Sequence, residues 1–386
     1  MNRGGGGSQP QCPCLGDKLL GIGSSRQTRR PSMHHCGRLH PHRANPALNR
    51  FGVFASAARG VGRDATIQGT DTDAAVSRLS AVELGYLQDP FAQYFVQQAG
   101  PGPSTRRLPI INRGTYTRTS GLDNLIDRFV AGSEAADEQP HERQIVSLGA
   151  GTDTRSLRLL GRPGVSGIVY HEIDFPLICT KKLNTIRAPA LRSLVSAPTV
   201  EDDGSSWCCQ TPDGKSLLRF HGLDLRQLAR QPEESSLAGL RTDIPTLLVS
   251  ECCLCYLETS EAGDVIRWFA DRIPNLGVLI YEPTKPDDPF GKTMVSNLAA
   301  RGITMPTLED YRLPADQEAR LKALGLEHAR HLTVDNVWAN WVSESEKERV
   351  DSLEGLDEVE EWNLLAGHYV ISWGWRGSGF RLWEDL

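Results

Sequence analysis

The sequence predicts an α/β protein built on a doubly wound parallel sheet. Short β-branched runs alternate with helical patterns over about 140 residues, the arrangement expected of strands joined by crossover helices. The first run ends in the pair Gly149 and Gly151, and acidic residues stand at the ends of the runs that follow. Ligands of open parallel sheets lie outside the carboxyl ends of the strands. The sequence therefore predicts a ligand site at these strand ends.

The expected strands are apolar, β-branched runs bounded by turn residues. They are 144–148, 167–173, 217–222, 246–250 and 278–281. A helix is expected over 258–273, because Ile266, Phe269 and Ile273 form one stripe. We also expect late edge strands around 332–341 and 368–375.

Three further segments are expected to form a cap over the sheet. Residues 74–100 carry apolar residues at helical spacing until Asp89-Pro90 interrupts the pattern, and helical character resumes over 121–130. Residues 287–325 do not fit the strand–helix alternation.

The first part of the chain has a composition of its own. Between Met1 and Arg63, nine arginines and Lys18 face only Asp17, a net charge of +9 against −6 for the whole chain. Because this stretch is rich in Gly and Pro and poor in large apolar residues, we expect residues 1–70 to be a disordered basic tail. The alternatives are an Arg-rich organelle transit peptide and a start codon assigned too far upstream.

The remaining chain, 71–386, is expected to be one folded domain. We divide it into a helical cap, a cofactor-binding core, a lid or insertion, and C-terminal strands with a helix. The corresponding ranges are 71–140, 141–285, 286–330 and 331–386.

Charge and cysteine usage argue against several classes. The net charge of −6 gives no support for nucleic-acid binding, and no stretch of apolar residues is long enough to span a membrane. The nine cysteines, with Cys252, Cys253 and Cys255 in one run, match neither a disulfide framework nor zinc-binding pairs. We expect reduced cysteines, no metal, and a cytoplasmic or also nuclear protein rather than a mitochondrial one.

The turn after the first strand allows a ligand to approach bare backbone. Gly149 and Gly151 permit a tight turn, but Thr154 stands where a dinucleotide fingerprint has its third glycine. Asp153 places a carboxylate where a pyrophosphate would be repelled, which disfavours NAD. The alternative is that Asp153 only caps the following helix.

Two other strand ends carry acidic residues suited to a nucleoside. Glu172 and Asp174 are two residues apart and share a face at the end of the second strand, where an acid can accept hydrogen bonds from both ribose hydroxyls; a solvated strand end is the alternative. Asp224 could accept from an adenine amino group while Leu225 packs on the ring, although an Asp before a helix is also a common cap. Together with the glycine turn, these residues favour a nucleoside-containing cofactor.

The fourth strand end offers groups for a charged ligand. Glu251 ends a mostly apolar run and, if buried, needs a cationic or hydrogen-bond-donating partner, for which an amino-acid ammonium would serve. Tyr256 could present its hydroxyl to the same cavity, or simply pack as an aromatic. Upstream, Arg113 and Arg118 supply planar guanidinium groups suited to carboxylates, with Arg78 as a weaker candidate; solvated surface arginines are the alternative.

Four motifs in this order resemble the leucine carboxyl methyltransferases. They are Asn112-x-Gly114-x-Tyr116-x-Arg118, Leu148-Gly149-x-Gly151-x-Asp153-Thr154-Arg155, Glu172-x-Asp174-Phe175-Pro176 and Ser250-Glu251-Cys252-x-Leu254-x-Tyr256. The resemblance extends from about Leu79 to the end and includes His368-Tyr369. It implies a class I S-adenosylmethionine-dependent methyltransferase fold with a helical N-terminal cap and a lid insertion. It also implies methylation of the C-terminal leucine of the protein phosphatase 2A catalytic subunit, by a protein that we expect to be a monomer.

The resemblance also implies roles for particular residues. Arg118 and Tyr256 would be catalytic, nearest to the substrate carboxylate. Arg78 departs from the lysine of other family members. Contacts to S-adenosylmethionine are expected from Arg78, Arg118, Gly149, Gly151, Asp153, Asp174, Asp224, Leu225 and Glu251.

Four other functions are weighed against this one. The related tRNA wybutosine methyltransferase carries an additional propeller domain, and no kelch-like repeats follow Trp375 here. A relative that methylates small carboxylates would differ mainly in its cap. A nicotinamide-dependent oxidoreductase is disfavoured by Thr154 and Asp153, and a catalytically inactive binding module by the intact cofactor positions.

Overall fold

A computed structural model describes residues 49–96, 106–132, 142–230, 236–357 and 359–386 of the chain. In this part of the chain one nine-stranded sheet forms, with the strand order β3-β4-β5-β2-β1-β6-β7-β9-β8. The strands are β1 Arg143–Leu148, β2 Ile168–Asp174, β3 Thr199–Val200, β4 Trp207–Gln210, β5 Leu217–Gly222, β6 Thr246–Glu251, β7 Leu276–Pro283, β8 His328–Thr333 and β9 Tyr369–Arg376.

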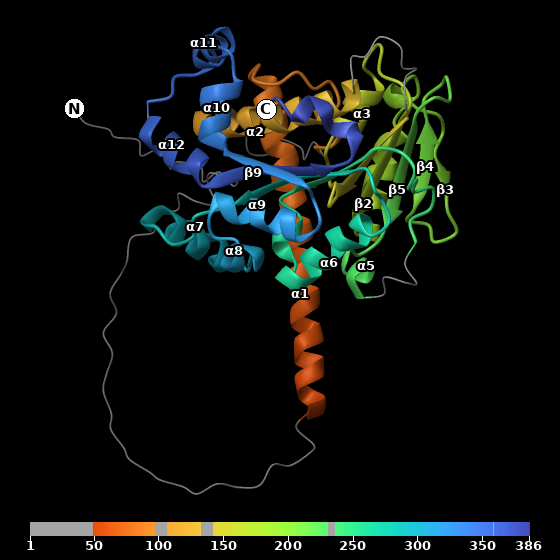
Figure 1. Ribbon diagram of the computed structural model, residues 1–386, viewed down its shortest axis with the longest axis horizontal. Coiled ribbons are helices and arrows are strands. Elements are labelled where there is room, and N and C mark those ends of the chain that lie inside the picture. Colours follow the sequence, from red (N-terminus) through yellow and green to blue (C-terminus); the bar gives the residue numbers. More distant parts are fainter. Residues whose placement is uncertain (1–48, 97–105, 133–141, 231–235, 358) are drawn as a thin grey trace, which may run out of the picture.

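The central five strands, β5-β2-β1-β6-β7, are parallel, as the sequence predicted. Antiparallel strands flank them, with β4 and β3 on one side and β9 and β8 on the other. Figure 1 shows the sheet with helices on both sides. The main helices are α1 Asn49–Glu83, α2 Pro109–Ala131, α3 Arg155–Leu160, α4 Pro176–Ile186, α5 Arg226–Arg230, α6 Thr259–Ala270, α7 Pro289–Ala300, α8 Thr307–Asp310, α9 Pro314–Ala323, α10 Val334–Trp341, α11 Glu344–Leu353 and α12 Val359–Gly367.

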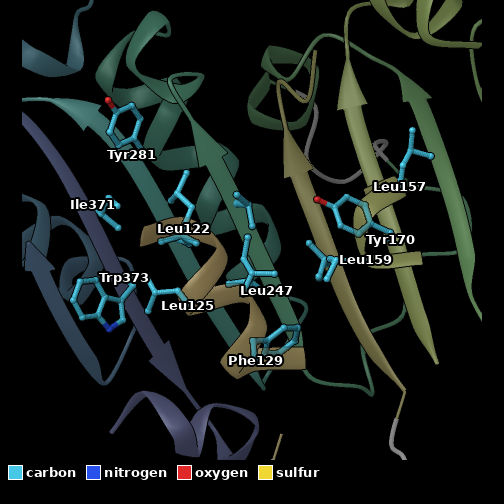
Figure 2. Packing of buried hydrophobic residues seen from close by; sticks show 14 of the residues in the cluster. Leu122, Leu125, Phe129, Leu157, Leu159, Tyr170, Leu247, Tyr281, Ile371 and Trp373 are labelled. Atoms are coloured by element: carbon cyan, nitrogen blue, oxygen red, sulfur yellow. The ribbon is translucent and has the colours of Figure 1, made fainter. Parts of the chain in front are cut away.

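Alternation along the central strands fills two apolar cores, one on each face. In β6, Leu247 and Val249 belong to the first core while Leu248 belongs to the second. This follows from the two-residue period of a strand, which sends successive side chains to opposite faces. In the first core, Leu125 and Phe129 of α2 pack near strands β6 and β9 (Figure 2). Helices α5, α6 and α9 cover the second core. Because both faces are covered, the ligand can approach only at the strand ends.

The C-terminal region differs from the prediction of two edge strands. The expected strand around 332–341 is wrong beyond Thr333, where α10 begins. Val334 and Val337 are buried and three residues apart, a helical spacing that the sequence interpretation missed. The other expected strand is β9, but it lies between β7 and β8 instead of at an edge, and almost all of its residues are buried.

The N-terminal boundary of the fold also requires correction. Helix α1 runs without interruption through the predicted start at residue 71, so residues 49–70 are helical and not a disordered tail. Residues 1–48, the rest of the predicted tail, lie outside the described residues.

Helix α1 ends earlier than expected, at Glu83, and Gly85 follows with a φ of +85°, a conformation that glycine adopts at little cost. In Figure 1 the first half of α1 extends away from the body of the molecule.

Helix α2 is longer than the predicted 121–130. It begins at Pro109, whose fixed φ suits the first helical position, and therefore carries Arg113 and Arg118 on its inner turns. Residues 287–325 contain α7, α8 and α9. No helix in the described residues has the length and apolar character needed to cross a membrane.

Candidate cofactor and active site

A cavity of about 390 Å³ lies at the carboxyl ends of β1, β2, β5 and β6. This volume lies in the range of roughly 300–1,000 Å³ typical of small-molecule sites. Helix α1 crosses over it, and Tyr369 of β9 closes one side. All ten predicted site residues line it, namely Arg78, Arg118, Gly149, Gly151, Asp153, Asp174, Asp224, Leu225, Glu251 and Tyr256. The structure thus brings together residues that are up to 178 positions apart; their individual roles stay predictions.

The glycine turn presents backbone to the cavity. Gly149 and Gly151 have φ values of +60° and +47°, in the left-handed region that disfavours other residues. A side chain at Gly149 would meet Cys253, with its Cβ only 2.5 Å from the cysteine Sγ. The Gly151 N–H donates to Asp174 over 2.8 Å, and the Thr152 N–H donates to Asp71 of α1 over 2.6 Å. The turn is therefore held from two sides while its open face borders the cavity.

Asp174 lies at the end of β2 with its carboxylate at the cavity wall. It accepts from the backbone N–H groups of Gly151, over 2.8 Å, and Phe175, over 2.7 Å. Burial raises the pKa of Asp174 to about 6, although these two hydrogen bonds act in the opposite direction. A carboxylate of this kind can accept further hydrogen bonds from ligand hydroxyls.

The raised pKa of Asp174 predicts that cofactor affinity depends on pH. Ligand hydroxyls prefer the ionised carboxylate, so affinity should fall below pH 6 by up to about tenfold per pH unit. The stability of the free protein depends on this group in the opposite direction. The stabilisation from the raised pKa of Asp174 is present at low pH and is lost as pH rises through about 6. Calorimetric titration with S-adenosylhomocysteine from pH 5 to 8 measures the effect. In Asp174→Asn the affinity should no longer depend on pH in this range. If affinity fell with the same slope against pH in both proteins, Asp174 would not be the group responsible.

Glu172, considered together with Asp174 as a ribose ligand, does not line the cavity. Its carboxylate is buried, pairs with Lys182 and accepts from Ser156 Oγ over 2.6 Å. The two-residue spacing does place both acids on one side of β2, but the carboxylate of Glu172 is taken up by the ion pair with Lys182 of α4. Only Asp174, at the last position of the strand, extends past the sheet to the cavity.

Asp224 and Leu225 occupy the corresponding position after β5. Asp224 accepts three hydrogen bonds from the Arg226 guanidinium, which also donates to Asp64 of α1 over 2.7 Å. Leu225 is buried at the cavity wall and packs in the second core. The apolar surface of Leu225 beside a carboxylate suits one edge and one face of an adenine ring.

Glu251 and two arginines form an ion-pair group at the end of β6. Oε1 of Glu251 lies 2.9 Å from Arg118 Nε, and Oε2 lies 3.2 Å from Arg155 Nη2. Arg118 is only 8% exposed, and burial would lower the pKa of its guanidinium, but the charge of Glu251 raises it. Among the described residues, Arg118 Nε has no hydrogen-bond acceptor in good geometry. A buried, permanently charged donor beside a cavity is suited to an anionic ligand group.

Two further predicted residues have partners within the protein. Arg78 of α1 pairs with the buried Asp89, which also accepts from Thr154 Oγ1 over 2.5 Å. Asp153 accepts from the Arg155 backbone N–H over 2.9 Å and pairs with its side chain. Burial would raise the pKa of Asp153, but the charges of Arg155 and Arg78 lower it. Asp153 therefore holds the start of α3, the alternative weighed from the sequence, and also borders the cavity; a contact to the cofactor stays a prediction.

Tyr256 closes the cavity near the end of β6. It belongs to the short helix η4, Leu254–Tyr256, and its backbone carbonyl accepts from Arg63 of α1 over 2.7 Å. Burial raises the pKa of the Tyr256 phenol well above its usual value, and its side chain is hydrogen-bonded to Thr70. Tyr256 is therefore a neutral group.

Cys252, four residues before Tyr256, has a φ of +49°, a rare conformation for a residue with a side chain and one that often marks functional sites.

Sequence interpretation missed the contribution of α1 to the site. Arg63, Asp64 and Asp71 reach across the ends of β6, β5 and β1 respectively. The first two fall inside the segment that was interpreted as a tail, where the surrounding Gly and Pro content concealed their role. Tyr369 was also missed as a site residue, although it is part of a motif in the resemblance.

The described residues contain no group of three or more His, Cys, Asp or Glu side chains arranged to hold a metal ion. Cys252, Cys253 and Cys255 are free thiols. Burial raises the pKa of the Cys253 and Cys255 thiols well above the usual value.

The sheet topology and this cavity define a class I S-adenosylmethionine-dependent methyltransferase. The glycine turn fits close approach of the cofactor, Asp174 its ribose, Asp224 and Leu225 its adenine, and Glu251 with Arg118 its charged amino-acid end. The family model described as leucine carboxyl methyltransferase matches residues 66–270. The chain belongs to the leucine carboxyl methyltransferase family, and its cofactor is S-adenosylmethionine.

Relatives of known name cover most of the chain. Leucine carboxyl methyltransferase 1 of Aspergillus fumigatus is 44% identical, over 88% of this chain and 91% of the relative. The Schizosaccharomyces pombe protein of the same name is 35% identical, over 82% and 96%. Human tRNA wybutosine-synthesizing protein 4 is 33% identical over 82% of this chain but only 45% of its own length. A putative methyltransferase structure from Thermobifida fusca aligns with a TM-score of 0.42 at 15% identity, covering 79% of this chain and 94% of its own.

Proposed function

We propose that this methyltransferase esterifies the C-terminal leucine carboxylate of the protein phosphatase 2A catalytic subunit and so takes part in phosphatase regulation. We further propose that it acts as a monomer in the cytoplasm, with the nucleus as a second compartment. The names of its relatives support a leucine substrate.

The observation that carries the proposal is the place of Arg118 between two cavities. A second pocket of about 30 Å³ shares Arg118 and Tyr369 with the large cavity. Its other walls are mostly apolar, from Ile110, Ile111, Val334, Trp362, Leu365 and Ala366. A cation beside an apolar surface suits a carboxylate attached to an aliphatic side chain. The pocket itself has room for only one or two water-sized groups, so a leucine side chain must widen it on binding.

The chemistry requires orientation more than acid–base catalysis. Bound S-adenosylmethionine supplies a methyl group on a sulfonium cation. A terminal carboxylate has a pKa of about 3.5, so it is already ionised at neutral pH and needs no base. Arg118 orients the carboxylate, neutral Tyr256 contributes a hydroxyl beside it, and the cover formed by α1 excludes water, which would otherwise stabilise the separated charges.

Transfer of a labelled methyl group to the intact phosphatase catalytic subunit tests the proposal. We expect labelling of the subunit that ends in leucine, and loss of labelling when this residue is deleted or its carboxylate is amidated. Replacement of the terminal leucine by glutamate should also abolish transfer, because the pocket beside Arg118 is apolar. Equal labelling of the amidated subunit, or transfer only to tRNA or small carboxylic acids, would refute the proposal.

A further inference from the structure

Arg155 is a buried arginine behind the cofactor cavity that the mechanism above does not use. It is the first residue of α3 and follows the glycine turn directly. Its side chain is only 2% exposed and does not line the cavity. The position cannot serve as a ligand contact, yet it places a full positive charge against the cavity wall.

The guanidinium of Arg155 contacts carboxylates from three separate elements. Nε lies 2.9 Å from Asp123 of α2, Nη1 contacts Asp153 of the glycine turn, and Nη2 lies 3.2 Å from Glu251 of β6. Each guanidinium nitrogen thus pairs with a different carboxylate. Burial would lower the pKa of Arg155, but these three negative charges raise it well above its usual value. The residue is therefore permanently charged and fixed in orientation.

Two of these three carboxylates line the cavity, and one of them has a second arginine. Glu251 uses Oε2 for Arg155 and Oε1 for Arg118, so each of its two oxygens pairs with a different arginine. Arg118 faces the cavity, whereas Arg155 lies behind the wall. If Arg118 turns to a ligand carboxylate, Arg155 remains to fix the carboxylate of Glu251 and to balance its charge.

We propose that Arg155 is a positioning residue for the amino-acid end of S-adenosylmethionine, acting through Glu251 and Asp153. The proposal rests on the cofactor site assigned above and not on the identity of the methyl acceptor. A shift of about 1 Å in a positioned group is enough to weaken its contacts substantially. Arg155 thus holds the carboxylates of Glu251 and Asp153 in register with the cavity.

Two nucleoside probes separate this role from a general structural one. S-adenosylhomocysteine carries the amino-acid end, whereas 5′-methylthioadenosine has the same nucleoside without it. In Arg155→Gln we expect binding of S-adenosylhomocysteine to weaken on the order of 10- to 100-fold, by analogy with the loss when a residue that orients a metal ligand is removed. Binding of 5′-methylthioadenosine should stay within about twofold. In steady-state kinetics the KM for S-adenosylmethionine should rise more than kcat falls.

Arg158 provides the matched control, one turn further along α3. It pairs with Asp123 over 2.6 Å and contacts neither Glu251 nor Asp153 in a salt bridge. Arg158→Gln should therefore leave the binding of both probes unchanged. Calorimetry with each purified full-length protein measures these affinities without any methyl acceptor, so the result is independent of the proposed substrate.

A conservative variant keeps the test decisive if Arg155→Gln does not fold. Arg155→Lys retains the charge, but its single ammonium group lacks the planar fork and cannot hold three carboxylates in the same geometry. Arg155→Lys should weaken the binding of S-adenosylhomocysteine but not that of 5′-methylthioadenosine. The loss should be smaller than in Arg155→Gln. A parallel loss of both probes in the folded variant, or unchanged binding of S-adenosylhomocysteine, would overturn the proposal.

Discussion

Replacement of Arg118 by alanine is expected to lower kcat/KM by roughly 30- to 5,000-fold, with a large part of the loss in kcat. Removing one partner of a buried, hydrogen-bonded charge pair costs about 2–5 kcal/mol, and each 1.36 kcal/mol corresponds to about a tenfold change in rate. Arg118 is almost fully buried, lines the cavity and adjoins the apolar pocket, so its loss should misalign the acceptor carboxylate. Initial rates with varied cofactor and varied acceptor separate kcat from the two KM values.

Two variants control for charge and for burial. Arg118→Lys keeps the charge without the planar fork and should recover only part of the rate. Arg128→Ala removes a half-buried arginine from the same helix, one that donates to Asn124 and to the Leu382 carbonyl and lines neither pocket. It should lower stability and leave kcat nearly unchanged. A normal kcat in Arg118→Ala, with only the KM for the cofactor raised, would show that Arg118 does not orient the acceptor.

Replacement of Gly149 by alanine is expected to destabilise the protein by about 2–5 kcal/mol and to abolish measurable cofactor binding. The left-handed φ of +60° costs an alanine about 1–2 kcal/mol. The new Cβ would also lie 2.5 Å from Cys253 Sγ and 2.8 Å from its Cβ, an overlap that typically costs about 1–3 kcal/mol. The overlap pushes apart the ends of β1 and β6, where the cofactor site lies. Denaturant unfolding and calorimetry with S-adenosylhomocysteine measure the two effects.

Gly164 offers a control that separates backbone strain from steric overlap. Its φ is +84°, but a Cβ there would meet nothing within 4 Å. Gly164→Ala should therefore show only the strain contribution and bind the cofactor normally. Similar losses in both variants would mean that strain alone explains the effect and that the contact between Gly149 and Cys253 is unimportant.

Local patterns were sufficient to predict the central strands and most of the site. Each of the five parallel strands lies within two residues of its predicted bounds at either end, because a buried strand needs a continuous apolar run and must end at a turn residue. The rule that ligands lie at the carboxyl ends of such strands then located Gly149, Asp174 and Glu251 at one cavity. The prediction of 334–341 as strand was wrong because an apolar run of this length fits the period of a helix as well as that of a strand. Packing against the rest of the protein decides between them.

The choice between Glu172 and Asp174 depended on contacts that no local pattern contains. Both acids have the spacing expected of a ribose ligand, but Lys182, ten residues downstream, reaches only Glu172. Likewise, Arg155 was visible in a motif, but its three carboxylates come from α2, the glycine turn and β6. Such pairings depend on the distance between elements after folding.

By itself, the sequence determined the α/β class, the central strands, the residues at their ends and, through joint motifs, the family. Only the tertiary structure decided that α1 covers the cavity, that β9 lies inside the sheet, and that Arg118 stands between the cofactor cavity and an apolar pocket. The physical reason is one of range. Periodicity and turn chemistry act between neighbours in the chain, whereas a cavity and its ion pairs are formed by groups that meet only when distant elements pack.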